Sequence, residues 1–316
     1  MGKRLIYCAF ASKEGFKGSE NLSGQANSLQ IYLQNACVCC FTAKKHNPDC
    51  DVAFVHNLKT IPEEFVAFFD KYNILSIYVE YSDFVFPPDY KWSLAFYKLC
   101  ALQYFAEKSS YESIVSLDVD TYSIGSLEPC FTLMKDRLVL YNVQHSYDLD
   151  AYRRRLEEYS QLYKSDAIPT VYGGEFIAGN KQQMQKFLQE CQKVYNLLQE
   201  KDFKTSFGDE FITFCAAEKY PDKIADAAPY IRRYWTTDLY YQCFTDHALA
   251  LRVVHVPNEK NNAFVRLYRH ILRVGDVPKN EEVFKMMGFP TARRPKYWCN
   301  IVYQFKRKVK KLFWGN

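Results

Sequence analysis

The 316-residue chain lacks several patterns, and each absence excludes a class of protein. It has no uninterrupted run of about 18 apolar residues, so we expect no membrane-spanning helix. It has no G-x-G-x-x-G pattern, which excludes the usual dinucleotide-binding fingerprint. An odd cysteine count and the lack of a secretion-signal pattern favour a reducing, cytosolic compartment.

The 11 cysteines form no cluster with histidine at zinc-ligand spacing. Cys37 and Cys40 make one C-x-x-C with Cys39 between them, but no second pair completes a zinc site. Because the segment has the pattern of a helix interior, we interpret all three as small buried side chains. A redox pair is the alternative.

Acidic residues are absent from the carboxyl-terminal segment 293–316, which makes the net charge of +5 uneven. Eight basic residues lie there, so the remaining chain has a net charge of −3. They are Arg293, Arg294, Lys296, Lys306, Arg307, Lys308, Lys310 and Lys311. The body is therefore mildly acidic and carries a basic appendage.

The appendage, about residues 292–316, alternates basic residues with large apolar ones such as Trp298, Phe305 and Trp314. At helical spacing this pattern is typical of a helix that lies on an anionic membrane surface. A nucleic-acid-binding arm is also basic but needs less of an apolar stripe. We therefore expect peripheral membrane association and no nucleic-acid partner.

Strand and helix patterns alternate along the chain, which predicts an α/β fold with a mostly parallel central sheet flanked by helices. With 48% hydrophobic residues the chain can bury a large core. We place a catalytic domain at 1–265 and a helical region at 266–316. The expected strands are 5–10, 51–57, 76–81, 114–117, 137–143, 170–179 and 251–257, and the expected helices are 25–45, 61–72, 92–107, 147–163 and 181–201.

Two aspartates, Asp118 and Asp120, directly follow the apolar strand 114–117. Ligand sites in open α/β sheets lie outside the carboxyl ends of the strands. Two carboxylates at one such point are costly unless a cation neutralises them, and Mg²⁺ or Mn²⁺ prefers oxygen ligands. The alternative is that the aspartates cap a turn or a helix.

The sequence Leu117-Asp118-Val119-Asp120-Thr121 resembles the D-x-D motif of GT-A-fold glycosyltransferases that use sugar nucleotides. Family 8 is the nearer resemblance and family-32-like enzymes are the second. The resemblance implies a GT-A-like, Rossmann-like fold and a metal held by Asp118 and Asp120. It also implies that Val119 and Ala9, at the end of the first strand, lie at the nucleotide.

Further segments match the family in the same order along the chain. Lys98 stands in a helix that in the family carries a basic residue, and the resemblance implies that it reaches the sugar-phosphate. A solvated surface lysine is the alternative. Gly173 and Gly174 resemble a segment where donor and acceptor meet, although a plain glycine bulge would look similar.

Asp209 and Glu210 open a helix that in the family faces the donor sugar, which implies a catalytic role. Carboxylates in a first helical turn also have a structural explanation, the helix dipole. His255 matches the third metal ligand of family-8-like enzymes, and Lys260 is the candidate phosphate contact. The usual H-x-x-G-x-x-K-P-W pattern is not kept here.

The resemblance implies a metal-dependent transferase that uses Mn²⁺ or Mg²⁺ and moves a hexose from UDP-galactose or UDP-glucose to a saccharide acceptor. Retention of the anomeric configuration is implied as well. The basic tail favours a lipid-linked acceptor, as in surface-polysaccharide or glycoconjugate synthesis.

Two other functions stay open. A haloacid-dehalogenase-like phosphohydrolase would use Asp118 as nucleophile, but its motif normally opens the fold and its second downstream acid is missing after Glu210. The other is a non-catalytic scaffold on a membrane.

Overall fold

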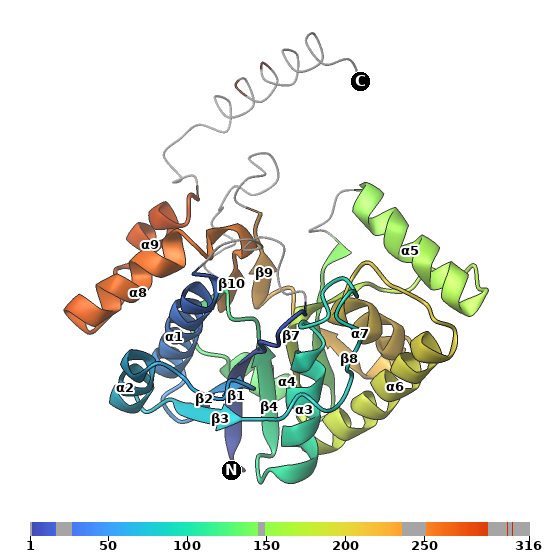
Figure 1. The fold of residues 1–316 in the computed structure, drawn as a ribbon, viewed down its shortest axis with the longest axis horizontal. Helices are drawn as coiled ribbons and strands as arrows, with labels where there is room; N and C mark the ends of the chain where they lie inside the picture. Colours follow the sequence, from blue (N-terminus) through green and yellow to red (C-terminus); the bar gives the residue numbers. More distant parts are fainter. Residues whose placement is uncertain are drawn as a thin grey trace.

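The computed structural model describes residues 2–16, 27–144, 149–235 and 251–289, together with 302 and 305. A seven-stranded sheet lies at its centre (Figure 1). Its strands are β1 (Arg4–Phe10), β2 (Asp51–His56), β3 (Leu75–Tyr78), β4 (Ser113–Leu117), β6 (Leu138–Asn142), β7 (Tyr172–Asn180) and β8 (Ile224–Asp226).

The strand order is β3-β2-β1-β4-β7-β6-β8. All neighbouring pairs run parallel except those of β7, which is antiparallel to both β4 and β6. Buried apolar side chains dominate the parallel strands β1, β2 and β4 because helices cover both faces of the sheet there. The mostly parallel α/β sheet expected from the sequence is confirmed.

Helices lie on both faces of the sheet. On β1, Tyr7 contacts Phe105 of α3 (Tyr97–Lys108), whereas the next residue, Cys8, lies 3.5 Å from Cys40 of α1 (Ser28–His46). Successive strand residues point to opposite faces, so α1 and α3 cover opposite faces. Helices α2 (Glu63–Lys71) and α8 (Ala263–Val274) pack with α1. Helix α6 (Lys181–Glu200) packs with α3, and α7 (Asp209–Ala217) packs with α6 and β7.

A second, three-stranded sheet lies beyond the carboxyl end of β4. Its order is β5-β10-β9, formed by β5 (Thr121–Ser123), β10 (Val253–His255) and β9 (Ile231–Arg233). Strand β5 begins one residue after Asp120, so this small sheet brings two late segments of the chain to the D-x-D motif.

Further α-helices of the described residues are α4 (Glu128–Leu133), α5 (Leu149–Tyr163) and α9 (Asn280–Met286). The C-x-x-C lies in the buried interior of α1, as the sequence predicted. The expected domain boundary at residue 265 falls inside α8, which packs on α1. The expected membrane-surface tail, 292–316, lies outside the described residues except for exposed Val302 and Phe305. No helix of the described residues is long and apolar enough to cross a membrane.

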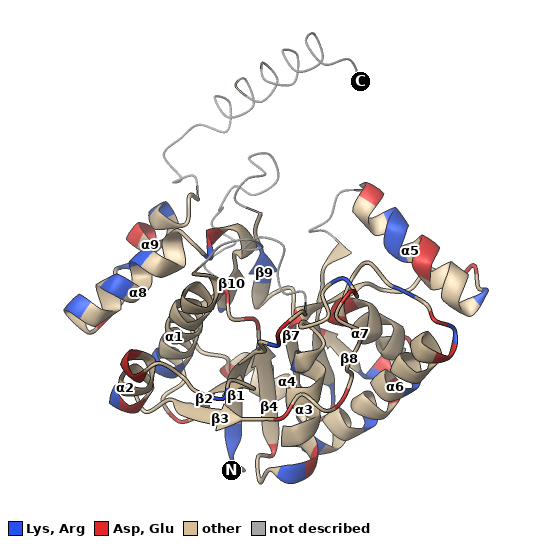
Figure 2. Cartoon of the chain, viewed as in Figure 1, with Lys and Arg blue, Asp and Glu red and all other residues tan. Residues whose placement is uncertain are grey.

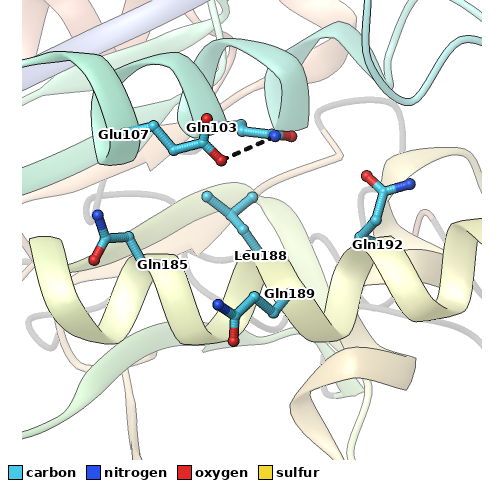
Figure 3. A pocket seen from close by; sticks show the side chains of 6 residues that line it. All are labelled: Gln103, Glu107, Gln185, Leu188, Gln189 and Gln192. Atoms are coloured by element: carbon cyan, nitrogen blue, oxygen red, sulfur yellow. Dashed lines mark hydrogen bonds between the residues drawn. The ribbon is translucent and has the colours of Figure 1, made fainter.

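A pocket of about 300 Å³ lies between α3 and α6 (Figure 3). Four glutamines and a glutamate surround Leu188 there, and Gln103 donates to Glu107 across 3.0 Å. The lining residues are Gln103, Glu107, Gln185, Leu188, Gln189 and Gln192, and none of them belongs to the D-x-D region.

Helix α6 follows β7 without a loop because Asn180 caps it. The Asn180 side chain accepts from Gln183 N at 2.9 Å, and the Gln183 side chain accepts from Asn180 N at 3.3 Å. We expect Asn180→Ala to lower the free energy of unfolding by about 1–2 kcal/mol in a urea titration, since N-cap substitutions cost this much. The same change at exposed Asn196 of α6 is the control and should cost less than about 0.5 kcal/mol. Equal losses at both positions would contradict the capping role.

Candidate metal and nucleotide site

The two aspartates of the D-x-D motif lie in a tight turn at the carboxyl end of β4. Thr121 closes this turn, because its backbone N–H and its hydroxyl both donate to the Asp118 carbonyl, at 3.1 and 2.7 Å. Asp118 stays partly exposed, whereas Asp120 is only 3% exposed. The turn therefore presents one carboxylate toward solvent and one toward the protein interior.

The small sheet places His255 against both aspartates. His255 pairs in register with Thr121, and Val256 N donates to the Asp120 carbonyl at 3.2 Å. The His255 Nε2 atom lies 3.2 Å from Asp120 Oδ1 and 3.8 Å from Asp118 Oδ2. One ligand atom from each of the three residues lies within 4.8 Å of the others.

This donor set fits a divalent cation. Two carboxylates and one imidazole nitrogen converge from two segments, and carboxylate oxygens are the donors that Mg²⁺ and Mn²⁺ prefer. Burial alone would lower the pKa of His255, but Asp120 and Glu175 outweigh it and raise that pKa to about 9. A positive charge is thus already favoured at the position that a cation would take.

Lys260 neutralises the buried carboxylate of Asp120. Its ammonium group donates to Asp120 Oδ2 and also to the Pro257 carbonyl at 3.2 Å. Burial would raise the pKa of Asp120, but Lys260 and His255 prevail and hold it well below the usual range. Asn35 of α1 fixes this lysine by donating to its carbonyl at 2.8 Å.

Lys98 is buried, so the alternative of a solvated surface lysine is wrong. It forms an ion pair with Asp118 Oδ1, lies 3.2 Å from Asp209 Oδ2 and donates to the Gly174 carbonyl at 2.8 Å. Burial would lower the pKa of Lys98, but the two aspartates raise it above its ordinary value. Lys98 therefore joins the D-x-D turn to the start of α7.

Two glycines, Gly208 and Gly174, allow the close packing around Asp209. Gly208, with φ at +61°, would bring a Cβ to 3.0 Å from Trp92, so glycine suits this position before α7. A Cβ on Gly174 would lie 2.1 Å from Asp209 Oδ2, so the second glycine admits the carboxyl group. Burial raises the pKa of Asp209 to about 6, despite the nearby Lys98 ammonium.

Glu210 contacts two arginines. Its Oε1 accepts from Arg155 Nη2 at 2.7 Å, and its Oε2 accepts from Arg233 Nη2 at 3.0 Å. Arg155 comes from α5 and also stacks over the Phe207 ring at 4.0 Å. The Glu210 carboxylate is therefore held in place and its charge is offset.

Three charged residues of this cluster were not predicted from the sequence: Arg155, Glu175 and Arg233. Glu175 is wholly buried and forms a bidentate pair with Arg233, at 2.7 and 2.6 Å. A usable signal existed for Glu175, because a carboxylate among the apolar residues of 171–178 requires a buried partner. The partner could not be named, since it lies 58 residues away.

The other expected residues also lie at this edge of the sheet. Cys8 pairs with Leu117, which places Ala9 beside the start of the D-x-D turn. Val119 has a buried side chain between the two aspartates. A Cβ on Gly173 would lie 2.0 Å from Glu175 Oε2, and the pairing of β6 with β7 shifts register just there. Figure 2 shows acidic segments gathered around β4, β7 and α7 with the basic β9 beside them.

No protein-family model matches the chain, and no curated protein matches it in sequence. Solved structures do match it in fold. Mouse xyloside xylosyltransferase 1 in its apo form has a TM-score of 0.53 and 12% identity, over 80% of this chain and 97% of the other. The galactosyltransferase LgtC, in complex with donor and acceptor sugar analogues, has a TM-score of 0.52 and 17% identity, over 94% and 99%.

The bifunctional glycosyltransferase WbbM in its apo form has a TM-score of 0.55 and 14% identity, over 90% of this chain and 52% of that one. The fold is therefore that of GT-A glycosyltransferases, as the sequence predicted. At these identities the likeness establishes the fold.

The raised pKa of Asp209 predicts a pH-dependent difference in stability. A carboxyl group with a folded pKa near 6 and an unfolded pKa near 3.8 stabilises the fold below the unfolded value, and this contribution is lost as the pH rises through 6. We expect the unfolding free energy of the wild type, relative to Asp209→Asn, to fall by about 2–3 kcal/mol between pH 4 and pH 8. Urea titrations of both proteins in a metal chelator measure it, and a difference independent of pH would contradict the assignment.

Proposed function

We propose that this protein is a metal-dependent glycosyltransferase that moves a hexose from a UDP-sugar, UDP-galactose or UDP-glucose, to a saccharide acceptor. The observation that carries the proposal is the convergence of Asp118, Asp120 and His255 beyond β4 in a GT-A fold. The chain's membership of family 8, rather than a family-32-like group, is part of the proposal. The glycosyltransferase neighbours and the order of the matching motifs support it.

Asp118, Asp120 and His255 would hold Mn²⁺ or Mg²⁺. When bound, such an ion supplies Lewis-acid stabilisation of the negative charge on a diphosphate leaving group. The ammonium group of Lys260 lies on Asp120, and it would contact the diphosphate once Asp120 serves as a metal ligand. Ala9 and Val119 would line the nucleotide at the ends of β1 and β4.

Lys98, Gly174 and Asp209 would bind the donor sugar. Lys98 fixes Asp209 at 3.2 Å, so that its carboxyl group can accept from or donate to a sugar hydroxyl. A side chain at Gly174 would displace this carboxyl group, and one at Gly173 would collide with Glu175 and Val143, so both positions need glycine. Lys98 would therefore act on the sugar-phosphate through the two aspartates that it bonds.

Glu210 and Asp209 are the proposed catalytic residues. Both Glu210 oxygens accept from arginines. We therefore propose that Glu210 fixes the position of the donor sugar and does not act as a nucleophile on it. Retention of the anomeric configuration is proposed from the family resemblance.

Binding of UDP should depend on the metal and on Asp120. In calorimetric titrations of UDP with and without Mn²⁺, we expect tight UDP binding only when Mn²⁺ is present. Asp120→Asn should weaken it by more than about 100-fold, since loss of an outer-shell partner already costs about 10- to 100-fold. Asp276→Asn, which alters an exposed carboxylate paired with Lys45, is the matched control and should bind as the wild type does.

No UDP binding in either condition would contradict the proposal, and phosphomonoesters would then be tested for the phosphohydrolase alternative. Intact binding by Asp120→Asn would remove Asp120 as a metal ligand. Metal-dependent UDP binding without hydrolysis or transfer of any UDP-sugar would favour the non-catalytic scaffold.

We also propose that the basic tail holds the protein on the cytoplasmic face of a membrane, where a lipid-linked acceptor for polysaccharide or glycoconjugate synthesis would lie. Its eight basic residues and its large apolar residues support this. Near an anionic surface each basic residue contributes about 1 kcal/mol.

Deleting residues 292–316 should abolish co-sedimentation with vesicles that contain phosphatidylserine, and added salt should weaken binding of the full chain. Vesicles of phosphatidylcholine alone are the control and should bind little of either protein. Unchanged binding after the deletion would contradict the role of the tail.

A further inference from the structure

Glu175 is a buried charge that the proposed chemistry leaves without a role. It is 0% exposed, in the middle of β7, and its own carbonyl accepts from Asp118 N at 3.2 Å. Its carboxylate accepts from Arg233 and lies 3.3 Å from His255 Nδ1. Burial of an ionised carboxylate is costly, so a structure keeps one only where its partners are well placed.

We propose that Glu175 is a positioning residue that keeps the proton of His255 on Nδ1, so that Nε2 is free of hydrogen when a metal binds. The inference rests on the proposed metal site. An imidazole coordinates through a nitrogen without a proton, and the hydrogen bond made by the other nitrogen selects the tautomer. Here Nε2 faces Asp120 and Asp118, at 3.2 and 3.8 Å, while Nδ1 faces Glu175.

The two sheets meet at this contact. His255 and Arg233 pair in register on neighbouring strands β10 and β9 of the small sheet, whereas Glu175 belongs to β7 of the main sheet. Glu175 therefore fixes the imidazole from the main sheet, which also carries the D-x-D turn at the end of β4. The orientation of His255 relative to Asp118 depends on this contact between the sheets.

Arg233 extends the contact to the proposed catalytic helix. Its Nη2 donates to Glu175 Oε2 at 2.6 Å and to Glu210 Oε2 at 3.0 Å. Both oxygens of Glu175 accept from the Arg233 guanidinium, at 2.7 and 2.6 Å, which is the pairing of an ionised carboxylate. Glu175 thus stays a carboxylate, which can only accept hydrogen bonds.

A glutamine at position 175 cannot reproduce these contacts. Oε1 accepts from Arg233 Nε at 2.7 Å and faces His255 Nδ1, and Oε2 accepts from Arg233 Nη2. An amide nitrogen at either position would set a donor against a donor. At the Oε1 position it would favour the tautomer with the proton on Nε2, which blocks coordination.

The test is the affinity for Mn²⁺, measured without nucleotide by the electron paramagnetic resonance signal of free Mn²⁺. We expect Glu175→Gln to weaken Mn²⁺ binding by about 10- to 100-fold, the usual effect of losing an outer-shell partner. Glu175→Asp keeps the charge opposite Arg233 but withdraws the carboxylate from His255, and we expect a loss of about tenfold. Thermal unfolding establishes that each variant is folded. If Glu175→Gln does not fold, the Mn²⁺ affinity of Glu175→Asp tests the inference by itself.

A second readout separates positioning from a merely structural role. The Mn²⁺ concentration that gives half-maximal UDP binding should rise by the same factor in Glu175→Gln, and excess Mn²⁺ should restore full binding. Arg4→Gln breaks a surface ion pair, Arg4 Nη1 to Glu128 at 2.5 Å, and serves as the control, with metal affinity unchanged.

Wild-type Mn²⁺ affinity in both folded Glu175 variants would overturn the inference and leave the proposed function intact. UDP binding by Glu175→Gln that excess Mn²⁺ does not restore would also overturn it. A wild-type protein that binds neither Mn²⁺ nor UDP would overturn the proposed function and this inference with it.

Discussion

Buried carboxylates at the end of a strand persist only where positive charge lies against them, and this constraint organises the cluster around β4. Desolvating an ionised carboxylate costs several kcal/mol, which a well-placed cation must offset. Lysine and arginine side chains from α3, α5, β9 and the segment after β10 supply those cations. The carboxylates are Asp118, Asp120, Glu175, Asp209 and Glu210, and their cationic partners are Lys98, Arg155, Arg233, Lys260 and, when protonated, His255.

The fold brings these charges together from distant parts of the chain. Parallel strands deliver the D-x-D turn to one edge of the main sheet, and the small sheet returns His255 and Arg233 to the same edge. Gly174 lets the first turn of α7 approach the antiparallel strand β7. The charges are thus balanced across both sheets, and under the proposed function Lys260 would pass from Asp120 to the diphosphate once Asp120 is a metal ligand.

Local sequence patterns predict part of the fold and part of the charged cluster. The apolar strand 113–117 followed by Asp118 and Asp120 is visible in a few residues, and the long helices show clear periodicity. The three-residue strands β5 and β9 are too short to show any period, so the small sheet was missed. The pairing of Glu175 with Arg233 was also missed, because an ion pair across 58 residues leaves no local pattern. The role of Lys98 at the sugar-phosphate stays a prediction, and its bonds to Asp118 and Asp209 could not be predicted from the local sequence.

The central claim is that Asp118, Asp120 and His255 form one metal site. Anomalous diffraction at the manganese absorption edge, from crystals grown with MnCl₂ and UDP, tests it most directly. We expect a single strong anomalous peak among the three side chains, with Lys260 moved away from Asp120. A peak elsewhere, or none among these residues with UDP bound, would contradict it.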